Sequence, residues 1–245
     1  MKPILLALLF GVASHAGLIT VNDGTLNDID WAGSILTNTN NASATFTANQ
    51  VVFGGNPNFF RQTTHTASPN GAGYNTIRIN DVYQPLTITG TGIVSIDFSF
   101  DTIYFNPNNS QYPGMGYQAA IFQGGSTFAE SSAIFNAITP IWTTNTRNGL
   151  TANSFCLTNN SNAQDCTIHP DFSVAGAPIK IGYITGNGLP KADVFGPQYS
   201  GLDNFRASIT TVTPEPATMG VGFLALGMIL AKLRHARTAA RSDVD

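Results

Sequence analysis

Strict alternation of apolar and polar residues constrains the fold of this chain more than any other feature. Residues 94–101 read VSIDFSFD, so that branched or aromatic residues alternate with serines and aspartates. Successive side chains of a β-strand point to opposite faces, so this pattern predicts a strand with one buried and one solvated face. Shorter alternating runs occur at 76–80 and 179–184.

Turn signals divide the rest of the middle region into short segments. Glycine, proline and asparagine cluster at 54–57, 68–71, 90–92, 106–109 and 186–188. They separate further strands that we expect at 43–53, 59–66, 117–122 and 204–211. Only Glu130 to Ile138 is compatible with a short helix. Many short strands between such turns predict an all-β fold, an antiparallel β-sandwich.

The N-terminus has the order of features found in a secretory signal peptide. Met1-Lys2 is followed by an apolar stretch over 4–13 and by Ser14-His15-Ala16, with small residues at the −3 and −1 positions. The sequence predicts a signal peptide over 1–16, read by the Sec translocon and cut by signal peptidase between Ala16 and Gly17. The alternative is a buried N-terminal helix. The domain then spans 17–212.

The C-terminus carries a second targeting pattern. Pro214-Glu215-Pro216 precedes an uncharged run over 217–231, and basic residues follow from Lys232 to Arg241. We expect a transmembrane helix at about 216–233 and a basic tail, 232–241, in the cytoplasm. A permanent single-span anchor without processing is the alternative.

This tail, 213–241, resembles the PEP-CTERM sorting signal of exported bacterial proteins. The resemblance implies recognition by the membrane protease-transpeptidase exosortase, with cleavage near Pro214-Glu215-Pro216. The chain would first be held in the inner membrane and then pass to the cell surface or the extracellular matrix.

The stretch from Gly55 to Thr211 is similar to a group of uncharacterised secreted bacterial domains of jelly-roll type. The resemblance implies a jelly-roll form of the β-sandwich, but it names no ligand and no reaction. It is carried by Gly55-Asn56-Pro57 with Arg61 and His65, by 95–99, 170–173 and 176–179, and by Gly201-Leu202-Asp203-Asn204-Phe205.

Composition narrows the classes of partner. Charged residues make up 10% of the chain, against about 25% in typical domains. Between Gly17 and Val212 there are six Lys and Arg and eleven Asp and Glu, a net charge of −5. Without a basic stripe, nucleic-acid binding is disfavoured.

Cys156 and Cys166 are the only two cysteines, and they flank a polar segment in a chain expected to be exported. We predict a disulfide between them. Closing this short loop is expected to stabilise the fold by roughly 3 kcal/mol.

Residues suited to catalysis are scarce, and we predict no catalytic residue. The two glutamates are Glu130 and Glu215, the second inside the sorting signal. Asp97 and Asp101 share a strand face about 13 Å apart, too far for a glycosidase pair, and are expected to be solvated. His65 is expected to make a structural hydrogen bond. A hydrolase of extracellular polymers is therefore the least favoured function.

Calcium is the cofactor that the sequence favours. Oxygen-bearing side chains occur at both ends of the domain, and hard oxygen ligands suit Ca²⁺. Asx-turns and solvated loops are the alternative. The candidate ligands are Asp23, Asp28, Asp30, Asp203 and Asn204.

The sequence predicts a non-catalytic structural or adhesive protein of the cell surface or matrix. The alternative is a carbohydrate-binding module for exopolysaccharide, because planar aromatic rings stack on sugars and amides bond their hydroxyls. The candidate stacking residues are Tyr112, in an irregular loop at 106–116, Tyr117 and Trp142.

Overall fold

The computed structural model describes residues 14–39, 41–69, 75–105, 114–131, 135–158, 163–189 and 197–214. Leu18–Thr211 forms one compact unit. The predicted transmembrane helix, the basic tail, Glu215, Pro216, Tyr112 and residues 1–13 of the signal peptide lie outside the described residues. Within the described part of the chain, no helix combines the length and apolarity needed to cross a membrane.

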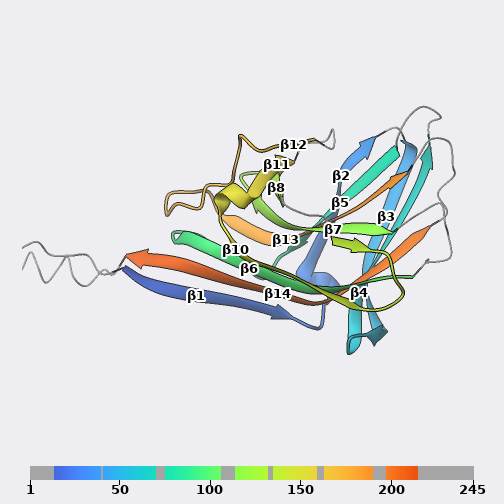
Figure 1. Ribbon diagram of the computed structural model, residues 1–245, viewed down its shortest axis with the longest axis horizontal. Coiled ribbons are helices and arrows are strands. Elements are labelled where there is room, and N and C mark those ends of the chain that lie inside the picture. Colours follow the sequence, from blue (N-terminus) through green and yellow to red (C-terminus); the bar gives the residue numbers. More distant parts are fainter. Residues whose placement is uncertain are drawn as a thin grey trace, which may run out of the picture. The chain divides into compact units, whose positions relative to one another are not determined.

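Sheet A has six strands and forms one layer of the fold (Figure 1). Its order is β10-β6-β14-β4-β3, with β1 also paired to β14. The pairs β10–β6, β14–β4 and β3–β4 are antiparallel. The strands are β1 (Ser14–Asp23), β3 (Asn41–Gly55), β4 (Asn58–Pro69), β6 (Gly92–Tyr104), β10 (Thr143–Leu150) and β14 (Gln198–Pro214).

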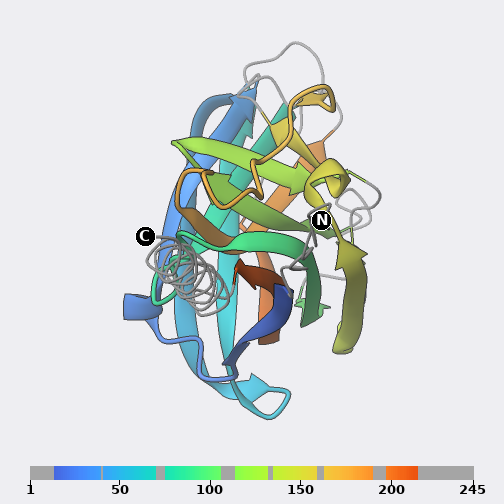
Figure 2. The ribbon, with the colours of Figure 1, turned by 90° about the vertical axis from the view of Figure 1, so that its left-hand side faces the viewer.

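Sheet B has eight strands in the order β12-β11-β8-β7-β13-β5-β2, with β9 paired to β7. The strands are β2 (Trp31–Thr39), β5 (Asn75–Tyr83), β7 (Met115–Gln123), β8 (Ser126–Glu130), β9 (Phe135–Ala137), β11 (Phe155–Thr158), β12 (Gln164–Asp165) and β13 (Ile179–Leu189). Two short 3₁₀ helices, η1 (Asp28–Asp30) and η2 (Ala152–Ser154), complete the described elements. Seen from the side, the long strands curve and twist (Figure 2), as β-strands of L-residues do.

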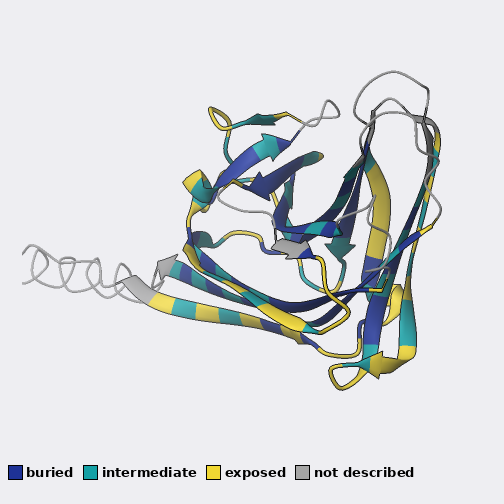
Figure 3. Ribbon diagram, turned by 45° about the vertical axis from the view of Figure 1, so that its right-hand side comes forward, coloured by how far each residue is buried: buried dark blue, intermediate teal, exposed yellow. Residues whose placement is uncertain are grey.

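The core lies where the inner faces of the two sheets meet. Phe205 of β14 shows the packing, since its ring lies 5.0 Å from Trp31, 6.1 Å from Phe98 and 6.4 Å from Tyr183. Burying each such side chain contributes roughly 1.5–3 kcal/mol. In Figure 3 the buried residues, dark blue, run along the middle strands, and the exposed residues, yellow, mark turns and sheet margins.

The predicted all-β antiparallel sandwich is confirmed, and its jelly-roll form stays a prediction. The alternating segment at 94–101 lies in β6, where Phe98 and Phe100 are buried. The stretch from Glu130 to Ile138, which is compatible with a short helix, forms no helix among its described residues. Glu130 ends β8, paired with Phe155, and Phe135–Ala137 forms β9 on β7. Pairing with neighbouring strands overrides the local propensity.

Candidate functional site

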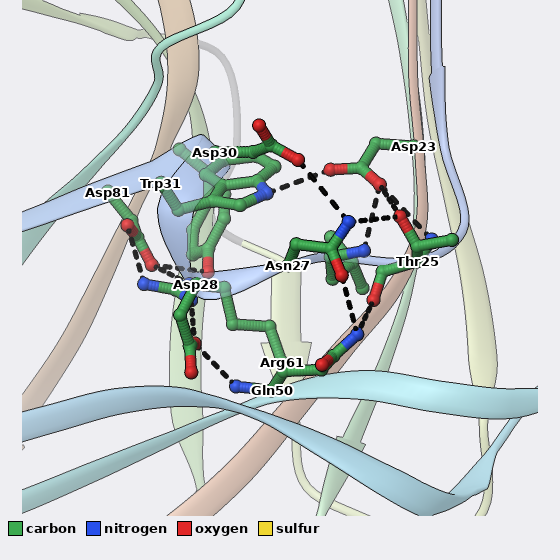
Figure 4. A network of polar contacts seen from close by, with 11 residues as sticks. Asp23, Thr25, Asn27, Asp28, Asp30, Trp31, Gln50, Arg61 and Asp81 are labelled. Carbon is green, nitrogen blue, oxygen red and sulfur yellow. Dashed lines mark hydrogen bonds and ion pairs between the residues drawn. The ribbon is translucent and has the colours of Figure 1, made fainter.

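An arginine-centred ion pair joins the two sheets inside the sandwich (Figure 4). Arg61 of β4 donates from Nε to Asp81 Oδ2 at 2.5 Å and from Nη2 to Asp81 Oδ1 at 3.2 Å. Tyr183 of β13 donates its hydroxyl to the same carboxylate at 2.8 Å. The guanidinium carbon also lies 5.8 Å from the centroid of the Trp31 ring. With all three polar groups buried and paired, this network serves the fold rather than a ligand.

Two predicted calcium ligands are engaged beside this network. The Asp23 carboxylate accepts hydrogen bonds from the Leu26 N–H at 2.8 Å and from Trp31 Nε1 at 2.9 Å. Asp28 accepts from Arg61 Nη1 at 3.0 Å and from the Gln50 N–H at 2.7 Å. These bonds fix the loop between β1 and β2 against β3 and β4.

A second polar cluster lies on the outer side of sheet A. Asp203 of β14 accepts a hydrogen bond from the Asn56 N–H at the β3–β4 turn. Asp101 of β6 accepts from Asn56 Nδ2 at 3.1 Å and from Asn204 Nδ2 at 2.8 Å. Burial raises the pKa of the Asp203 carboxyl, and the nearby Asp101 adds to the rise, while the N–H groups of Asn56 and Asn204 oppose it.

This cluster corrects the expectation that Asp97 and Asp101 occupy a solvated face. Asp101 is buried because the turn and β14 cover it. Asp97 is half-buried and accepts from the Gly149 N–H at 2.6 Å. The structure thus places Asp203 and Asn204 with Asn56 and Asp101, and gives Asp23 and Asp28 other partners. No group of three or more His, Cys, Asp or Glu suited to a metal ion occurs among the described residues, and calcium binding stays a prediction.

Next to this cluster, aromatic side chains pack beside Trp142. The Trp142 indole donates from Nε1 to the Gly54 carbonyl at 3.0 Å, and its ring packs edge-on against Phe60 with centroids 5.6 Å apart. Phe60 also contacts Phe105, at 5.5 Å. Phe53 and Ile141 directly precede Gly54 and Trp142 in the sequence, and we call these two residues together with Phe60, Phe105 and Trp142 the Trp142 patch.

Much of the Trp142 patch is open to solvent. Phe53 is 80% exposed, Ile141 70% and Phe105 36%, whereas Phe60 is buried and Trp142 is half-buried. Several apolar side chains exposed together are unusual on a soluble surface and mark interaction sites. The patch therefore has the character of a binding surface.

Gly201 of β14 makes room for the tryptophan ring. A Cβ at this position would lie 2.8 Å from Ile103 Cγ2, 2.8 Å from Phe60 Cδ2 and 2.9 Å from Trp142 Cη2. Such contacts are shorter than packed side chains tolerate, so only glycine lets the ring settle onto the sheet. The position of Trp142 is thus set by the Gly54 carbonyl of β3, by the missing side chain at Gly201 of β14 and by the Phe60 ring.

The structure separates the three predicted stacking residues. Trp142 lies at the surface, in the patch. Tyr117 is fully buried and bonds Ser200 Oγ at 2.6 Å, so the expectation that it stacks on a sugar is wrong. Its ring faces the core because β7 is covered by sheet A. Tyr112 lies outside the described residues.

Sequence reasoning missed Phe53, Phe105 and Ile141. The sequence holds one signal for Phe53, because Val52-Phe53 stands directly before the turn at Gly54-Gly55. An apolar side chain beside such a turn lies outside the core. Phe105 follows β6 and Ile141 lies just before β10, so only the pairing of β6 with β10 and β14 brings these two residues into the patch.

His65 and the cysteines behave as the sequence predicts. His65 is fully buried, its Nε2 lies 3.0 Å from Thr185 Oγ1, and burial lowers its pKa to about 4. This confirms the structural hydrogen bond. Cys156 and Cys166 form the predicted disulfide, with Cα atoms 4.4 Å apart. That the chain is not an enzyme stays a prediction.

Comparison with known proteins gives no family for this chain. No family model matches it, and no curated protein does. Among solved structures, it resembles the mannan-recognising carbohydrate-binding module TmCBM27, at 12% identity and a TM-score of 0.36, over 80% of this chain and 98% of that one. It also resembles the CBM22-1 xylan-binding domain of Paenibacillus barcinonensis Xyn10C, at 8% identity and a TM-score of 0.36, over 80% and 97%. At these TM-scores the likeness does not establish a shared site.

Proposed function

We propose that this chain is an exported, non-catalytic carbohydrate-binding β-sandwich, and that the Trp142 patch is its binding surface. The observation that carries the proposal is the half-buried indole of Trp142, held by the Gly54 carbonyl and Phe60 beside exposed aromatic groups.

The ring is held in place before any ligand arrives. Its N–H is satisfied at 3.0 Å and its edge rests against Phe60, so little side-chain freedom remains to be lost on binding. Rigid aromatic groups offer a large apolar area at low entropic cost. A pyranose presents C–H groups on its faces, and these pack well on such a ring.

The polar surroundings suit a neutral ligand that carries hydroxyl groups. On β10, the three residues that follow Trp142 are Thr143, Thr144 and Asn145, and Asn56 is exposed at the adjoining turn. Hydroxyl and amide groups donate and accept hydrogen bonds without net charge. The two carboxylates of the adjoining polar cluster, Asp101 and Asp203, are buried and bonded to asparagine groups. A sugar polymer fits this chemistry better than a charged partner.

The proposed setting follows from the targeting patterns of the sequence. A signal peptide over 1–16 and the PEP-CTERM-like tail would deliver the domain to the cell surface or the matrix, where exopolysaccharide is available. Pull-down with mannan, xylan and bacterial exopolysaccharide tests binding, and the first two are the polymers named for the structural neighbours. We expect at least one polymer to retain the full chain.

Substitutions test whether the Trp142 patch is the surface that binds the polymer. Trp142→Ala should abolish retention, and Trp142→Phe should keep part of it because a ring remains. Ile168→Ala removes an apolar side chain that is 45% exposed outside the patch, and it should bind normally. Equal retention of Trp142→Ala and the unmodified chain would contradict the assignment.

A further inference from the structure

The outer edge of β3 presents backbone N–H and C=O groups that could pair with another strand. β3 is the terminal strand of sheet A beyond β4. Its Gln50 N–H donates to Asp28 Oδ1 at 2.7 Å, away from β4, so Gln50 and Arg61 form a pair without ladder hydrogen bonds. Such pairs alternate along an antiparallel ladder. The N–H and C=O groups of Ala44, Phe46 and Ala48 therefore also point away from β4.

This edge lacks the devices that protect the other sheet margins. β10 carries Arg147 and a register shift after it, β2 is irregular between Ile35 and Thr37, and β12 has only two residues. On β3 the register is regular from Ser43 to Val51, a stretch without charge or proline. Among the described residues, no backbone group outside β4 bonds to Ala44, Phe46 or Ala48. Unprotected edges of this kind pair with other strands.

The sequence of the edge is symmetric about Phe46. It reads Ala44-Thr45-Phe46-Thr47-Ala48, the same in both directions. An antiparallel two-fold contact would set Phe46 opposite Phe46 of the second copy and Ala44 opposite Ala48. These are the residues whose N–H and C=O groups point outward, so each such pair would exchange two hydrogen bonds. Thr45 would face Thr47 of the second copy in the closer type of pair.

We propose that two copies of this chain associate through β3, edge to edge and antiparallel, with the two-fold axis at Phe46. Closed two-fold contacts use the same surface on both copies, which the symmetric sequence provides. The contact ends where Asp28 occupies the Gln50 N–H. The inference is independent of carbohydrate binding.

Charge pairs at positions 45 and 47 test the contact, because both side chains are exposed and substitutions there should leave the fold intact. Thr45→Lys/Thr47→Lys sets lysine against lysine at both ends of the two-fold contact. Thr45→Lys/Thr47→Glu sets lysine against glutamate at the same places. Sedimentation of the full chain in detergent, over a range of concentrations, measures association for each.

We expect the unmodified chain and the lysine–glutamate variant to dimerise, and the lysine–lysine variant to dissociate at least about tenfold more readily. Monomers in all three would overturn the proposal, as would equal dimerisation of all three. Ala48→Pro gives a second test, because it removes an N–H that β4 does not use. The variant should be a folded monomer. Its thermal midpoint should equal that of the unmodified chain when the latter is measured at concentrations too low for dimerisation.

Discussion

Arg61 on β4 and Asp81 on β5 form a two-point ion pair, at 2.5 and 3.2 Å, that joins the two sheets within the sandwich. Both side chains are nearly inaccessible to water, at 3% and 2% exposure. Removing either partner of a pair so deeply buried is costly, because the other charge is then left alone in the interior.

We expect Arg61→Met to lower the free energy of unfolding by about 3–5 kcal/mol, since it leaves the Asp81 carboxylate buried without its cation. Urea unfolding measures the loss. Arg206→Met is the matched control, because Arg206 lies on the exposed face of β14 and its removal should change little. Adding Asp81→Leu to Arg61→Met should recover part of the loss. Additive losses from the two substitutions would contradict the pairing.

Stability should fall with acidification because of His65. Its pKa is lowered from 6.5 to about 4 by burial, so the unfolded chain takes up a proton at a higher pH than the folded chain. The stability is fully present above pH 6.5 and is lost as the pH falls towards 4, by about 3 kcal/mol in all. His65→Gln should flatten this part of the pH profile of urea unfolding. His169→Gln should keep it, and an unchanged slope in His65→Gln would refute the assignment.

Reduction of the Cys156–Cys166 disulfide should destabilise the fold by roughly 3 kcal/mol, because the unfolded chain gains freedom. Thermal unfolding with and without reductant measures the change. In Cys156→Ala/Cys166→Ala the midpoint should be low from the start and insensitive to reductant. A reductant effect of similar size in that variant would point to another cause.

Gly201→Ala should weaken polysaccharide retention without a substitution in the exposed patch itself. The new methyl group would meet Phe60, Ile103 and Trp142 and push the indole from its position. We expect about tenfold weaker binding, together with a loss of stability of about 1–3 kcal/mol from overpacking. Gly24→Ala is the control, because its Cβ would have no neighbour closer than 3.9 Å. Undiminished retention by Gly201→Ala would separate Trp142 from the site.

The sequence predicts some strands of each sheet and misses others. Alternation marks β6 because Ile96, Phe98 and Phe100 enter the core. β10 escapes notice because its sequence, TTNTRNGL, has no apolar face at the margin of sheet A. The stretch after Glu130 is compatible with a helix by its sequence, but Glu130 pairs with Phe155, on a strand 25 positions away along the chain.

Contacts between residues far apart in the sequence also determine which predicted site residues meet and which are buried. Arg61 and His65 stand out in the sequence, yet their partners Asp81 and Thr185 are identified only by the folded structure. The sequence predicts Trp142 as a ligand contact because planar aromatic rings stack on sugars. Tyr117 met the same criterion and is buried, because burial depends on which sheet covers the strand.

Tryptophan fluorescence tests the proposed binding surface most directly, because the chain has only Trp31, which is 5% exposed, and Trp142, which is half-buried. Acrylamide quenching of the full chain is measured with and without a polysaccharide that retains it, and repeated on Trp142→Phe. If sugars stack on Trp142, the polysaccharide will protect the unmodified chain from quenching and will leave the quenching of Trp142→Phe unchanged. Equal quenching of the unmodified chain with and without saturating polysaccharide would contradict the proposed site.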